Sequence, residues 1–185
     1  MAILVREAVV QDLDSLLPVW EDINAGVSKL GAAPLESRIA LSTTSEFFRV
    51  LAAWDGEKAV GLALVSIADV GTWVEMPSLQ ISGLHVLRSS RHRGVAKALL
   101  NSALGYADIW GCNSIMASVP PQERDANRFF ARLGFAPIAT RRICDTAQLR
   151  KKISDEPSRM VAQRIRRRSA SILSGELRPG RAADK

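Results

Sequence analysis

Residues 85–110, HVLRSSRHRGVAKALLNSALGYADIW, decide how this chain is organised. An apolar run, Leu79 to Leu87, leads into a short basic turn, and Gly94 then opens a segment with helical periodicity. The side chains that recur at helical spacing in that segment are Val95, Ala98, Leu99, Ser102, Ala103, Tyr106, Ile109 and Trp110. The pattern predicts a strand, a basic glycine turn and a helix that buries one stripe.

The turn has the chemistry of an anion site. The first backbone N–H groups of a helix lack partners inside the helix, and the helix dipole adds positive potential at the same end. Gly94 has no side chain, so a phosphate can come close to the backbone. Arg91 and Arg93 add guanidinium groups, whose paired donors suit phosphate oxygens. The sequence therefore predicts a diphosphate ligand here.

Two common diphosphate motifs are absent from the sequence. No glycine-rich loop ends in lysine followed by serine or threonine, and G-x-G-x-x-G does not occur. What the turn does contain is R-x-x-G-x-A, formed by Arg91, Gly94 and Ala96. This resembles motif A of the GCN5-related N-acetyltransferase (GNAT) family, which holds the pyrophosphate of acetyl-coenzyme A. Leu84-His85-Val86 stands where that family has the strand whose backbone pairs with the pantetheine arm.

A second block resembles motif B of the same family. It is RDANRFFARLGFAP, residues 124–137, and it follows motif A in the family's order and at its distance. The resemblance spans roughly residues 3 to 144. It implies a mixed α/β fold with a mostly antiparallel sheet of about six to seven strands, helices on both faces, and acetyl-CoA as co-substrate. The residues it implies for binding acetyl-CoA are Leu84, His85, Val86, Arg91, His92, Arg93, Gly94, Val95, Ala96, Asn127 and Phe130.

Motif B departs from the family in its chemistry. The family's tyrosine that donates to the departing thiolate is replaced by Phe130, which has no hydroxyl. The family's asparagine seven residues earlier is replaced by Glu123, and Asn127 lies one helical turn further along the same face as a substitute. Ser118 stands where some relatives place a carboxylate, and a serine cannot act as the base.

Two side chains are candidates for the general base. Glu75 is expected in a loop, 69–77, before the central strand, and His85 is expected on that strand beside the thioester. Each has an alternative interpretation: Glu75 as a solvated loop carboxylate, and His85 as a packed strand histidine whose backbone alone binds pantetheine. Tyr106, the one tyrosine, lies on the predicted buried stripe and is interpreted as core.

Elements along the rest of the chain follow from periodicity and turn residues. Strands are predicted at 3–8, 47–54, 60–68, 79–87, 113–119 and 135–144, and helices at 11–23, 35–42, 124–133 and 148–153. The strands 47–54 and 60–68 are expected to form a hairpin around Asp55-Gly56. Gly83 is expected to mark a bulge or a close backbone approach.

Charge divides the chain into a domain, residues 1–153, and a basic, partly helical tail, residues 154–185. Up to Leu149 there are 14 Lys and Arg against 15 Asp and Glu, and from Arg150 onward 11 against 4, so the net charge changes from −1 to +7. With 185 residues and 47% hydrophobic content, one domain of ordinary size is expected. Neither a metal-ligand cluster of Cys and His nor an apolar run of twenty residues is present, so we expect a cytoplasmic protein without a metal.

Two functions are consistent with these features. The first is an acetyl-CoA-dependent N-acetyltransferase that acts on a primary amine, either a small molecule or a peptide. The second, motivated by Phe130 and the basic tail, is a weakly active or inactive acyl-CoA-binding protein that acts through the tail on an acidic partner. That partner would be nucleic acid, a membrane surface or a protein; the tail is otherwise a solvated segment or part of a homodimer contact. The acceptor amine is left open.

Overall fold

The computed structural model describes residues 3–26, 34–71, 74–140 and 142–154, without the side chains of 70–76. The chain divides into two compact units, Met1–Ala136 and Pro137–Lys185. In the second unit the described residues contain one helix, 146–154, where a short helix at 148–153 is predicted. The tail from residue 155 onward, including its predicted helix, lies outside the described residues.

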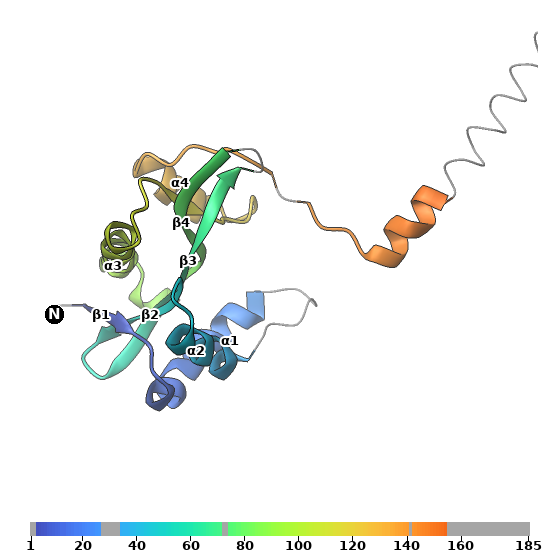
Figure 1. Cartoon of the computed structure of the whole chain (residues 1–185). Coiled ribbons are helices and arrows are strands. Elements are labelled where there is room, and N and C mark those ends of the chain that lie inside the picture. Colours follow the sequence, from blue (N-terminus) through green and yellow to red (C-terminus); the bar gives the residue numbers. More distant parts are fainter. Residues whose placement is uncertain (1–2, 27–33, 72–73, 141, 155–185) are drawn as a thin grey trace, which may run out of the picture. The chain divides into compact units, whose positions relative to one another are not determined.

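The first unit is built on one five-stranded sheet within the described part of the chain (Figure 1). Its strands are β1 (Leu4–Glu7), β2 (Phe48–Asp55), β3 (Lys58–Gly71), β4 (Val74–Val86) and β5 (Ile115–Ala117). They lie side by side in sequence order; the first four are antiparallel neighbours, and β5 runs parallel to β4. This confirms the mixed α/β class with a mostly antiparallel sheet.

Helices cover both faces of this sheet, as predicted (Figure 1). The helical elements are η1 (Val10–Asp12), α1 (Leu13–Gly26), α2 (Leu35–Thr44), η2 (Arg88–Ser90), α3 (Val95–Ile109) and α4 (Arg124–Arg132). One apolar cluster joins α3 and α4 to the sheet, and a second cluster joins α1 and α2 to it. The two helical layers therefore rest on opposite sides of the same strands.

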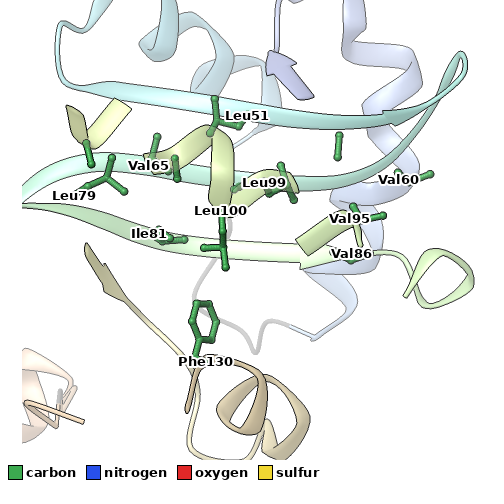
Figure 2. Packing of buried hydrophobic residues seen from close by; sticks show 14 of the residues in the cluster. Leu51, Val60, Val65, Leu79, Ile81, Val86, Val95, Leu99, Leu100 and Phe130 are labelled. Atoms are coloured by element: carbon green, nitrogen blue, oxygen red, sulfur yellow. The ribbon is translucent and has the colours of Figure 1, made fainter. Parts of the chain in front are cut away.

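The alternation of side chains along β2 explains these two clusters. Leu51 and Ala53 belong to the cluster under α3, whereas Val50 and Ala52 belong to the cluster under α1 and α2, and all four are fully buried. A strand buried on both faces carries apolar residues at consecutive positions, as this one does. Figure 2 shows part of the cluster on the α3 side, which includes Leu99 and Leu100 of α3 and the sheet residues Val65 and Ile81.

Two details differ from the sequence prediction. The prediction of a sixth strand at 135–144 is wrong, because 135–140 and 142–144 form no strand. Pro137 in this run has no N–H to donate, and the exposed Ile138 and Ile143 are five residues apart, so they would point to opposite faces of a strand. Ile109 was predicted to be buried but is 75% exposed. It lies about a third of a turn from the centre of the stripe formed by Val95, Leu99, Ala103 and Ala107.

Gly61 allows α3 to lie close to the sheet. An added Cβ at this position would be 2.9 Å from the backbone oxygen of His85, 3.1 Å from Cγ1 of Val95 and 3.3 Å from Cδ1 of Leu99. The backbone oxygen cannot move away as a flexible side chain can. Gly61 therefore fixes how near the start of α3 comes to β3 and β4.

We expect Gly61→Ala to lower the free energy of unfolding by about 1–3 kcal/mol, because the methyl group overpacks this contact. Urea denaturation measures the change. The matched control is Gly105→Ala in the interior of α3, where nothing lies within 4 Å of an added Cβ. It should raise the free energy of unfolding by about 0.5–1 kcal/mol, since alanine is the better helix former. A Gly61→Ala protein as stable as the parent would contradict the close approach.

A bidentate ion pair holds the chain where β1 turns into the first helical segment. The guanidinium of Arg6 donates to both oxygens of Asp12 at 2.6 Å, and the Val9 N–H donates to the same carboxylate at 2.9 Å. The Asp12 side chain is 10% exposed, and the Arg6 guanidinium lies 4.5 Å above the ring of Trp54. The hydrogen bonds from Arg6 are the main cause that lowers the pKa of Asp12; the hydrogen bond from Val9 and the charge of Arg6 lower it further, while burial raises it.

Because the folded state depresses the pKa of Asp12, its ionised form stabilises the protein above about pH 4, the ordinary aspartate range, and this stabilisation is lost as pH falls further. Asp12→Asn should lower the free energy of unfolding by about 1–2 kcal/mol at pH 7, at the low end because Arg6 is 41% exposed. The difference from the parent should shrink below about pH 4. Urea denaturation at several pH values measures it, with Glu57→Gln in the exposed hairpin turn as control. A difference that does not depend on pH would contradict the ion pair.

Candidate active site

Strand β4 is paired with β5 over only part of its length. The register runs from Leu79 opposite Ile115 to Ile81 opposite Ala117, and the last bond joins the Ser118 N–H to the Ile81 oxygen at 3.0 Å. Residues 83–86 of β4 are paired with β3 on one edge. At their other edge no strand is present in the described part of the chain. The sheet therefore opens beside the last residues of β4.

A bulge in β4 lies at the point where the two strands part. Leu64 pairs with Gly83, but Val65 pairs with Ile81, so Ser82 is the extra residue. An extra residue bends its strand and increases the local twist. The bulge is one position from Gly83, where the sequence predicted a bulge or a close approach. It turns the end of β4 away from the direction of β5.

Two hydrogen bonds attach the turn between β4 and α3 to strands β3 and β4. The Leu87 N–H donates to the Val60 oxygen at 3.0 Å, and Nε of Arg91 donates to the Val86 oxygen at 3.2 Å. His92 and Gly94 both have positive φ, 62° and 84°. Glycine adopts this conformation without strain, which accounts for Gly94 at the N-cap of α3.

The N-terminus of α3 has open backbone donors. The first helical hydrogen bond at this end joins the Ala98 N–H to the Gly94 oxygen at 3.0 Å, and no side chain caps the helix. The N–H groups of Val95, Ala96 and Lys97 therefore have no carbonyl one turn earlier in the helix. Nothing lies within 4 Å of where a Cβ on Gly94 would be, so the space in front of these donors is open. This is the geometry of an anion seat.

Arg93 is held by a residue that the sequence prediction missed. Its Nη2 lies 2.8 Å from Oδ2 of Asp55, whose side chain is only 13% exposed. Asp55 ends β2 at the two-residue turn of the β2–β3 hairpin, where the sequence predicted a turn and no functional role. The ion pair links that hairpin to the turn before α3. Arg91 and His92 are exposed.

His85 has a partner on the first helix. Its Nε2 lies 2.8 Å from Oδ2 of Asp22 in α1, and the two side chains are 24% and 40% exposed. The hydrogen bond from His85 lowers the pKa of Asp22, assisted by the charges of His85, Arg88 and Arg91, while burial raises it. No sequence motif pointed to Asp22, because it stands 63 residues before His85.

The motif B residues lie on α4. Phe130 is buried and packs its ring edge to face against Phe129 and Phe135, with ring centroids 5.4 and 5.0 Å apart. Figure 2 shows it pointing toward Ile81 and Leu100 in the α3-side cluster. Nδ2 of Asn127 donates to the oxygens of Pro120 and Glu123, at 3.0 and 2.8 Å, and so fixes the loop before α4.

Polar groups also meet where β4 and β5 part. Gln80 is 6% exposed, and its Nε2 donates to Oγ of Ser118 at 3.1 Å and to the Ile81 oxygen at 3.0 Å.

Glu75 was expected in a loop, but its backbone belongs to β4, because the β3–β4 ladder extends to Gly71 opposite Val74. The hydroxyl of Tyr106 donates to Glu7, and burial is the main cause that raises its pKa to about 12.

Among the described residues no group of three or more His, Cys, Asp or Glu side chains is placed to hold a metal ion. Nor does any helix within those residues have the length and apolarity needed to cross a bilayer.

The profile of the Acetyltransferase (GNAT) family matches residues 14–135, about two thirds of the chain. The chain belongs to the GNAT acetyltransferase family. Comparison with curated protein sequences gives no match. Within this family, the anion seat, the end of β4 and the open edge beside β5 correspond to the motif A region identified from the sequence.

Solved GNAT structures share the fold. A transcriptional regulator from Bacillus halodurans superposes with a TM-score of 0.65 at 21% identity, covering 78% of this chain and 99% of its own. The aminoglycoside N-acetyltransferase AAC(6′)-Iy, solved with the bisubstrate analogue CoA-S-monomethyl-acetylneamine, gives 0.62 at 21% identity and covers 78% and 100%. A ribosomal-protein-alanine N-acetyltransferase from Brucella melitensis gives 0.64 at 13% identity and covers 78% and 99%. At these identities the likeness concerns the fold.

Proposed function

We propose that this GNAT protein is an acetyl-CoA-dependent N-acetyltransferase that transfers an acetyl group to a primary amine. The observation that carries the proposal is the combination of an unpaired β4 edge with an open helix N-terminus directly after it. An extended chain that ends in a diphosphate fits this combination, and the pantetheine arm and pyrophosphate of CoA are such a chain.

The pyrophosphate is assigned to the N-terminus of α3. The N–H groups of Val95, Ala96 and Lys97 offer donors, and the open space at Gly94 admits phosphate oxygens. Arg91 keeps both terminal guanidinium nitrogens for the phosphates, because only its Nε is engaged by Val86. Arg93 is the more distant contributor, since Asp55 already pairs with it.

The pantetheine arm is assigned to the unpaired edge of β4. Residues Leu84, His85 and Val86 are paired with β3 on one side, which leaves the β5 side for an added strand-like ligand. Peptide-like amides can bind such an edge by main-chain hydrogen bonds. This places the thioester near the point where β4 and β5 part, beside His85 and Ser118.

The reaction needs a neutral amine, a proton acceptor and a stable leaving group. The amine nitrogen attacks the thioester carbonyl, the C–N bond forms, the C–S bond breaks, and CoA leaves as a thiolate. Thiols are much stronger acids than alcohols, and a cysteine thiol has a pKa of about 8.5, so a thiolate can leave without a dedicated acid. Phe130 supplies no proton, but the Ser118 hydroxyl accepts from Gln80 and keeps its own hydrogen for donation. Glu75 and His85 are the candidate bases.

The acceptor is assigned by chemical class alone. AAC(6′)-Iy was solved with an acetylneamine analogue, and the Brucella relative is described as acting on ribosomal-protein alanine. These acceptors share a primary amine and little else. A primary amine is accordingly the acceptor class that we propose, without a particular compound.

The first test is calorimetric titration with acetyl-CoA. Arg91→Ala should weaken binding about tenfold, because a hydrogen bond to a charged group contributes about 1.5–3 kcal/mol. Gly94→Asp should weaken binding more than Gly94→Ala, since both strain the positive φ but only aspartate repels a phosphate. Arg132→Ala, which removes a charge from the last turn of α4, is the control. The proposal fails if the parent shows no binding at high micromolar acetyl-CoA, or if Arg91→Ala and Gly94→Asp bind as the parent does.

The second test is turnover, which separates an enzyme from an acyl-CoA binder acting through its tail. We expect thiol release from acetyl-CoA with at least one amine among neamine, spermidine, lysine and a peptide with a free N-terminal alanine. A chain ending at Ile153 should retain that activity, because every residue assigned to the site precedes residue 131. Acetyl-CoA binding without thiol release, together with nucleic-acid retention that disappears on truncation, would instead support the binder with a basic tail.

A further inference from the structure

The hydrogen bond between His85 and Asp22 crosses from the central strand to the first helix. It joins Nε2 of His85, on the unpaired end of β4, to Oδ2 of Asp22 in α1, at 2.8 Å. Both side chains remain partly exposed, 24% and 40%, so a small amine can reach the imidazole. The pair therefore lies beside the edge assigned to the thioester and is open to the acceptor.

This contact fixes which imidazole nitrogen is basic. A carboxylate only accepts hydrogen bonds, so Nε2 must carry the hydrogen that Asp22 receives. In the neutral imidazole Nδ1 then has the free lone pair. The lowered pKa of Asp22 agrees with a carboxylate that stays ionised at neutral pH. A histidine held in this way presents one defined basic atom.

Asp22 is the acidic group that contacts the imidazole. Arg88 and Arg91, which follow β4, are close enough to act on the Asp22 carboxylate. The contact between Oδ2 of Asp22 and Nε2 of His85, at 2.8 Å, joins α1 to the central strand and holds the ring in one orientation.

We propose that Nδ1 of His85 accepts the proton of the attacking amine, and that Asp22 is the positioning residue that orients and stabilises the ring. As the C–N bond forms and the C–S bond breaks, one N–H proton of the amine passes to Nδ1 and CoA leaves as a thiolate. The imidazolium, hydrogen-bonded to Asp22, then releases its proton to water. This inference rests on the proposed acetyltransferase function and names the base for it.

The test measures kcat, KM and the pH profile with the panel amine that the parent uses best, together with acetyl-CoA binding by calorimetry. His85→Ala should lower kcat about 100-fold, the scale of general-base catalysis, and leave acetyl-CoA affinity within about twofold, since the backbone of residue 85 is unchanged. Asp22→Ala should lower kcat about tenfold and leave acetyl-CoA affinity within about twofold, because the ring loses the hydrogen bond that orients it. Asp22→Glu should restore part of the rate.

Two further variants separate catalysis from structure. Glu21→Gln, on the neighbouring exposed residue of α1, should leave kcat and the pH profile unchanged. In the His85→Ala background, Asp22→Ala should have little further effect, because Asp22 acts through the imidazole. If Asp22→Ala lowers kcat by the same factor with or without His85, the positioning role is overturned. Unchanged kcat in His85→Ala overturns the base, whereas absence of acetyl-CoA binding in the parent is a failure of the proposed function itself.

Discussion

The parting of β4 from β5 is the constraint on which the candidate site depends. Two parallel strands joined by a helical crossover are normally paired along their length, and here the pairing stops after Ile81 and Ala117. The bulge at Ser82 bends β4 at that position, so the separation is built into the strand. Unpaired backbone groups are costly in a core, whereas at a partly exposed edge they remain available to pair with another extended chain.

The same geometry brings a second set of unpaired donors to the site. Gly61 lets α3 rest close to β3 and β4, and Gly94 lets the chain enter α3 directly after a short turn. The open N–H groups of α3 therefore begin only a few residues beyond the open edge of β4. The open edge of β4 and the N-terminus of α3 both present unpaired backbone groups. The Asp55–Arg93 ion pair joins the turn between them to the β2–β3 hairpin.

Sequence reasoning predicted the parts of the fold that depend on local pattern. Each of the helices α1 to α4 and strands β1 to β5 was anticipated within a few residues, because apolar periodicity, Gly94 and the Asp55-Gly56 turn are local signals. The predicted strand at 135–144 failed because a short apolar run does not show whether a neighbouring strand exists to pair with it. Ile109 failed because it stands at the margin of a helical stripe, where neighbouring elements decide burial.

In the candidate site, too, features that depend on local sequence were predictable, and contacts between distant elements were not. A phosphate seat made of backbone N–H groups needs only a glycine and a helix start, so a six-residue motif was enough to predict where Arg91 and Gly94 lie. Side-chain chemistry depends on contacts between distant elements, and Asp22 and Gln80 became visible only when α1 met β4 and β4 met β5. The replacement at Phe130 fits this division. A ring packed against Phe129 and Phe135 supports the fold without supplying a proton, so the proposed reaction takes its proton acceptor from another residue. Binding through backbone groups tolerates the replacement of a side chain, such as that of the motif B tyrosine by Phe130. Proton transfer does not, because each replacement changes which group can donate or accept the proton.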